Sequence, residues 1–153
     1  MLIRFTRLTN ERHRFEIVRD DGSREAHELE TRSTLAHDLA HYAVETEAGL
    51  RHSFYGRLAS GTSYGELTTL PPHEPEVMQT ERVVVMLQTA FKKPECDSHE
   101  TLLRTLSAFD AVAEARPPWL TAEVMQRTLE HLRRLHGQWR ATPFHHALEL
   151  NFS

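Results

Sequence analysis

The chain has 153 residues, of which 39% are hydrophobic and 26% are charged, and its formal net charge is −4. These values are typical of a single globular domain and argue against a general nucleic-acid-binding protein, which would need a basic surface. No apolar run is long enough to cross a membrane, so we expect a cytoplasmic protein without a membrane partner. The single cysteine, Cys96, excludes an internal disulfide and a zinc site built from several cysteines.

Residues 1–32 predict an antiparallel meander of three strands. Apolar and polar residues alternate in LIRFTRL and again in RHRFEIVRD, as expected for strands with one buried face. The dipeptide Asp21-Gly22 is typical of a two-residue type I′ hairpin turn. The third strand, at 23–30, is more polar, and we expect it at the edge of the sheet. Such a small sheet needs a cover for its apolar face.

The helices that follow would supply that cover. Ser33 or Thr34 is a suitable N-cap for the first helix, and Gly49 is a suitable C-terminal stop. A short helical turn is expected in HSFYGRLAS, followed by a loop in GTSYGELTTLPPHEP. Pro75 then begins a second long helix, because proline is well tolerated in a first turn.

Two more helices are expected after that. Asp97 with Glu100 resembles a capping box at the start of the third helix. Thr121 caps the fourth, for which Gly137 is the expected stop. The predicted fold is therefore a single α+β domain over residues 1–153, with an N-terminal three-stranded antiparallel meander packed against four or five helices. Its parts are a meander (1–32), a helical region (33–137) and a tail docked on the body (138–153).

The first predicted helix carries the candidate site. Apolar residues cover most of this helix, and the remaining stripe holds His37, Asp38, His41 and Glu45. Two histidines four residues apart on a helix project to the same side and can share one divalent ion, as in HExxH. In HDLAH the acidic residue is Asp38, which is one methylene shorter than glutamate. This shorter reach counts against Asp38 as a general base on a metal-bound water, so we expect it to orient a histidine, with a direct catalytic role as the alternative.

The third ligand is open on the sequence alone. Glu45 lies one turn beyond His41, and its side chain leans back toward the histidines. His52 is within reach if the chain folds back after the helix. Glu81, on the second long helix, is a further alternative if that helix packs against the first. Zinc or another divalent cation would suit these nitrogen and oxygen donors.

The motif HDLAH, followed by His52, resembles the HDxxH zinc motif of a helical ubiquinone-biosynthesis family. The resemblance covers about 20 residues, and it implies that His37, Asp38 and His41 are metal-site residues. It also implies that His52 lies near the position of that family's glutamate. The chain further resembles small bacterial proteins with a meander followed by HDLxHxxxE, a resemblance that implies no activity.

Two interpretations of the stripe follow. In the first, the protein binds a zinc-type metal through His37 and His41, with Glu45 or His52 completing the site. Such a site is compatible with a hydrolytic or lyase-like activity. In the second, the stripe is the solvent face of a surface helix, and the protein is a metal-free interaction or regulatory module. A homodimer formed through the predicted edge strand at 23–30 is compatible with either interpretation.

Overall fold

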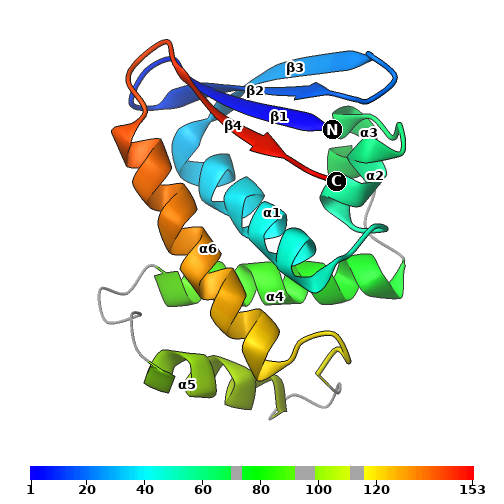
Figure 1. The fold of residues 1–153 in the computed structure, drawn as a ribbon, viewed down its shortest axis with the longest axis vertical. Coiled ribbons are helices and arrows are strands. Elements are labelled where there is room, and N and C mark those ends of the chain that lie inside the picture. Colours follow the sequence, from blue (N-terminus) through cyan, green and yellow to red (C-terminus); the bar gives the residue numbers. More distant parts are fainter. Residues whose placement is uncertain (70–73, 92–98, 111–115) are drawn as a thin grey trace.

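The computed structural model describes residues 1–69, 74–91, 99–110 and 116–153. It has an α+β architecture in which a twisted antiparallel sheet covers one end of a group of helices (Figure 1). The two ends of the chain lie close together, because the Met1 ammonium group donates to the Phe152 carbonyl at 2.8 Å. No helix among the described residues is both long enough and apolar enough to cross a membrane.

The predicted N-terminal meander is confirmed. Its strands are β1 (Leu2–Arg7), β2 (Arg12–Val18) and β3 (Arg24–Glu30). In each of the first two strands one set of alternate residues is buried, as the sequence pattern predicts. With a further strand, β4 (Ala147–Asn151), the order is β3-β2-β1-β4, so β3 lies at an edge of the sheet, as expected.

The turn between β2 and β3 differs from the predicted type I′ turn. The Gly22 amide donates to the Arg19 carbonyl, and the Arg19 amide donates to the Ser23 carbonyl, each at 2.9 Å. Gly22 has a φ of 85°, whereas Asp21 does not have the positive φ that a type I′ turn requires. The hairpin prediction is therefore confirmed, but its turn is one residue longer, with glycine in the left-handed position that follows the bend.

The C-terminal tail is a strand of the sheet. Residues Ala147–Asn151 form β4, which pairs antiparallel with β1, so the described sheet has one strand more than the meander alone. The alternating burial of β4 places Leu148 and Leu150 in the core. The tail thus adds apolar area to a sheet that three strands would leave small.

The remaining elements of the described residues are helical and lie on one side of the sheet, with α5 farthest from it (Figure 1). The helices are α1 (Ala36–Ala48), α2 (Phe54–Ala59), α3 (Tyr64–Thr69), α4 (Pro75–Phe91), α5 (His99–Asp110) and α6 (Ala122–Ala141). The short turn in HSFYGRLAS and the start at Pro75 are confirmed. The segment predicted as a loop contains α3, so that prediction is wrong in part. Cys96 and Asp97 lie outside the described residues.

The start of α1 differs from the expected N-cap. A π-helical turn at Thr31–Leu35 leads directly into α1, and the Ser33 and Thr34 hydroxyls donate to the Glu30 carbonyl instead of accepting from helix amides. The capping prediction is therefore wrong. The backbone is already helical in the turn before α1, so neither Ser33 nor Thr34 stands at the start of the helix. The other end is as predicted: Gly49 is left-handed, with a φ of 68°.

Helix α6 begins as predicted and ends later than predicted. The Thr121 hydroxyl accepts from the Val124 amide at 3.1 Å, and Leu129, Leu132 and Leu135 are buried. The helix continues through Gly137, because Trp139 in its last turn is buried in the core and holds that turn in place. The Gly137 stop is therefore wrong, and local glycine propensity is overridden by packing.

We expect Gly137→Ala to raise the free energy of unfolding by about 1 kcal/mol. A Cβ at this position meets no atom within 4 Å, and alanine loses less conformational entropy than glycine on entering a helix. Urea unfolding of the two proteins measures the difference. A lower free energy of unfolding in Gly137→Ala than in the wild type would contradict this prediction.

Candidate metal site

Helix α1 is the central helix of the fold. It packs against α4, α6 and α2, and all residues from 38 to 45 are buried. The polar stripe is therefore enclosed: His41 and Glu45 are 0% exposed and Asp38 is 3% exposed. The solvent-face interpretation is wrong for these three side chains. Only His37 retains substantial contact with solvent, with its side chain 33% exposed.

Helix α4 brings a glutamate to the two histidines. His41 Nε2 lies 3.0 Å from Glu81 Oε1, and His37 Nε2 lies 3.7 Å from Glu81 Oε2. The two imidazole rings are 4.7 Å apart between centroids, as the four-residue spacing predicts. The Nε2 atoms of both histidines thus face one carboxylate.

These three side chains form a possible metal-binding group. One ligand atom from each of His37, His41 and Glu81 lies within 4.8 Å of the other two. Tetrahedral zinc with bonds of about 2.0 to 2.1 Å separates its ligand atoms by about 3.4 Å. Modest side-chain rotation would close the group around an ion. Because Glu81, like His37, is about one-third exposed, with a side-chain value of 34%, the group can be reached from solvent.

Glu45 is close to this group but turned toward different partners. Its Oε1 lies 3.1 Å from His41 Nδ1, on the side of the ring opposite Glu81. Its Oε2 accepts from the Tyr55 amide at 2.8 Å and from the Gly56 amide at 3.2 Å. Both oxygens are therefore engaged away from the position that the two histidines share with Glu81.

Asp38 is buried, but it does not contact a histidine in the way that the sequence predicts. Its Oδ2 is buried and has no hydrogen-bond partner among the described residues. The carboxylate that holds a histidine ring is Glu45, and no hydrogen bond joins Asp38 to either histidine in the described structure. Burial raises the pKa of Asp38 to about 7.

His52 does not join the group. It lies on the exposed connector after α1, where its backbone amide donates to Glu76 Oε1 at 2.9 Å. The chain does fold back after Gly49. This places the side chains of Ser53 and Tyr55 in the core, but not that of His52. Of the proposed third ligands, Glu81 is the one that faces both histidines.

The charges in the site are strongly coupled. Burial alone would lower the pKa of His41, but its hydrogen bonds to Glu45 and Glu81 outweigh burial and raise that pKa to about 9. Burial likewise acts to raise the pKa of Glu81, and the hydrogen bond and charge of His41 reverse the direction, so that it is lowered. Burial, followed by the charge of His41, lowers the pKa of His37. Without a metal ion, a charged His41 is thus held between two carboxylates.

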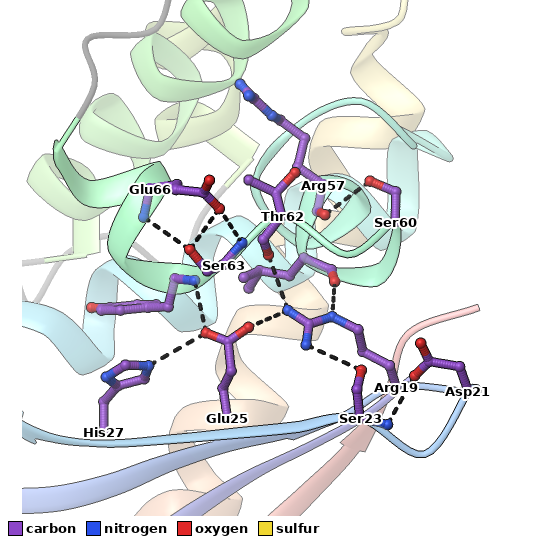
Figure 2. A network of polar contacts seen from close by, with 12 residues as sticks. Arg19, Asp21, Ser23, Glu25, His27, Arg57, Ser60, Thr62, Ser63 and Glu66 are labelled. Carbon is purple, nitrogen blue, oxygen red and sulfur yellow. Dashed lines mark hydrogen bonds and ion pairs between the residues drawn. The ribbon is translucent and has the colours of Figure 1, made fainter.

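The backbone that holds Glu45 is itself tied to the sheet. Arg19, at the end of the β2–β3 hairpin, donates to the Leu58 carbonyl at 2.6 Å and to the Thr62 carbonyl at 3.0 Å (Figure 2). Arg19 also pairs with Glu25, whose other oxygen accepts from the Tyr64 amide at 2.9 Å. These contacts fix α2 and the start of α3 against the hairpin.

The sequence contains one signal for Glu81. It lies four residues after Val77 and three before Val84, both buried, so a carboxylate interrupts the apolar stripe of α4. Gln88, two turns further along, shares that side of the helix, and its Oε1 lies 3.4 Å from His37 Nδ1. A charged residue within an apolar stripe indicates a buried partner, but the sequence does not identify that partner.

Comparison of the chain with protein-family models, with curated proteins and with solved structures finds no significant match. The candidate site therefore rests on its own residues and geometry.

Proposed function

We propose that the protein binds a divalent metal ion of the zinc type through His37, His41 and Glu81. The observation that carries the proposal is the convergence of both Nε2 atoms on one carboxylate, with His41 buried and the other two side chains partly open to solvent. Two imidazoles and a carboxylate are donors that zinc accepts readily. A group of three protein ligands also leaves a coordination position for water or a substrate.

Such an open position is what distinguishes catalytic from structural zinc sites. When bound, a divalent ion would supply an activated water or polarise a carbonyl group. The chain's own residues would hold the ion, with Gln88 accepting from His37 Nδ1 and Glu45 accepting from His41 Nδ1. Hydrolytic or lyase-type chemistry is compatible with this arrangement, and metal binding is the step to test first.

The test is the zinc content of tag-free protein after dialysis, followed by titration with zinc in competition with a chromophoric chelator. We expect about one equivalent per chain in the wild type. His37→Ala and Glu81→Gln should weaken zinc binding more than about 100-fold, because each removes a direct ligand. Both side chains are partly exposed, so these variants are expected to fold.

His52→Ala is the matched control, since it removes an exposed histidine of the connector after α1 that is not part of the His37, His41 and Glu81 group. Its zinc affinity should equal that of the wild type. The proposal is contradicted if the wild type takes up no zinc, or if His37→Ala and Glu81→Gln bind it as tightly as the wild type does. Loss of zinc in His52→Ala alone would assign the third ligand to His52 instead.

A further inference from the structure

Glu45 divides its two carboxylate oxygens between the candidate site and helix α2. Oε1 lies 3.1 Å from His41 Nδ1, while Oε2 accepts from the amides of Tyr55 and Gly56 at 2.8 and 3.2 Å. These two amides belong to the first turn of α2, where helix amides have no partner within the helix. Ser53, at the N-cap position, makes no side-chain capping bond. Glu45 therefore takes the place of the cap, and its orientation is fixed by the backbone.

Without an ion His41 is charged and both of its ring nitrogens carry a proton, and a carboxylate fixed in this way determines which nitrogen keeps its proton when the other binds an ion. Burial raises the pKa of Glu45, while a charged His41 and the two backbone amides favour its ionised form. Oε1 of the ionised carboxylate can only accept, so the neighbouring Nδ1 has to donate. Nε2 is then the nitrogen left to bind an ion, and it is the one that faces Glu81 at 3.0 Å. We infer that Glu45 is a positioning residue, which holds His41 with Nδ1 protonated and Nε2 directed at the metal. This inference rests on the proposed function and deepens it.

Glutamine at position 45 would break this arrangement in either orientation. If its amide oxygen kept the bonds to the Tyr55 and Gly56 amides, its NH₂ group would face His41 Nδ1. Nδ1 would then have to accept, and the proton would move to Nε2, the atom needed for the metal. If the side chain were flipped, its NH₂ group would face two backbone donors and leave the first turn of α2 without acceptors.

Glu47 offers a matched control on the same helix. It also binds a histidine, with Oε1 2.8 Å from His131 Nδ1, and it accepts from Arg127 at 3.1 Å. His131 is outside the His37, His41 and Glu81 group. Glu47→Gln therefore removes the same charge and the same type of contact from α1 without touching the orientation of His41.

The experiment compares zinc affinity by chelator competition in the wild type, Glu45→Gln and Glu47→Gln, with the unfolding temperature of each metal-free protein. We expect affinity to fall about 10- to 100-fold in Glu45→Gln and to stay unchanged in Glu47→Gln. A purely structural role would lower the unfolding temperature and leave the affinity of the folded protein unchanged. Equal affinities in the wild type and Glu45→Gln would overturn the inference, while zinc binding by the wild type would leave the proposed function standing.

A second measurement does not depend on the variant folding. Nitrogen-15 NMR of the wild-type protein with zinc bound should show His41 coordinated through Nε2 and protonated at Nδ1. Coordination through Nδ1 would overturn the inference, because Glu45 would then be displaced from its partner. Failure of the wild type to bind zinc would instead contradict the proposed function itself.

Discussion

Gly56→Ala is expected to lower the free energy of unfolding by about 3 kcal/mol or more. A Cβ built on Gly56 would lie 2.1 Å from the Arg51 carbonyl oxygen and 2.3 Å from its carbonyl carbon. These are backbone atoms of the connector between α1 and α2, so no side-chain rotation relieves the overlap. The connector or the first turn of α2 has to move, and both are buried against the core at Ser53 and Tyr55.

The same movement would reach the candidate site, because the Gly56 amide is one of the donors to Glu45. Chemical unfolding followed by circular dichroism measures the loss of stability. Gly65→Ala is the matched control, since Gly65 also lies in a short helix and a Cβ there meets nothing within 4 Å. We expect the control to gain about 0.5 to 1 kcal/mol. Equal stabilities of Gly56→Ala and the wild type would contradict the close approach of the connector.

Acidification from pH 7 to pH 4 is expected to cost about 3 kcal/mol of stability through His13 alone. His13 is 0% exposed, and its ring packs against Phe5 and Trp139 with centroids 5.9 and 6.0 Å away. Its Nε2 has no hydrogen-bond partner among the described residues, and Nδ1 lies 3.2 Å from the Thr31 hydroxyl. Burial, followed by the charge of Arg12, lowers the pKa of His13 to about 4.

The direction of this pH effect follows from the protonation of His13 in the folded and in the unfolded chain. Between about pH 6.5 and pH 4 the unfolded chain carries a proton on His13 that the folded chain does not, so stability falls as the pH is lowered through this window. Asp38, whose pKa burial raises to about 7, also takes up a proton on acidification from pH 7, and the comparison with His13→Phe removes such contributions. The wild type should lose about 3 kcal/mol more than the variant between pH 7 and pH 4. Parallel pH profiles for the two proteins would show that His13 is not the group responsible.

Local sequence patterns predicted most of the elements but fewer of their ends. Alternation identified the strands of the meander, and Pro75, Gly49 and Thr121 marked helix ends that the structure confirms. Each of these signals acts within a few residues through backbone conformation or a capping bond. The prediction failed at Gly137, where a buried tryptophan two residues later continues the helix. It placed the tail on the body of the fold but did not identify its partner β1, which lies at the opposite end of the chain.

The candidate site, too, could be predicted only in part from the sequence. The sequence by itself placed His37 and His41 on one side of a helix, because four residues make about one turn. It could not decide whether that side faces water, nor choose among Glu45, His52 and Glu81, because both depend on which helices pack against α1. The tertiary structure decided these points: α4 and α6 cover the stripe, α4 brings Glu81 to both Nε2 atoms, and the amides of α2 turn Glu45 away from them. Spacing along a helix is a local property, whereas burial and the third partner are set by contacts between segments far apart in the chain.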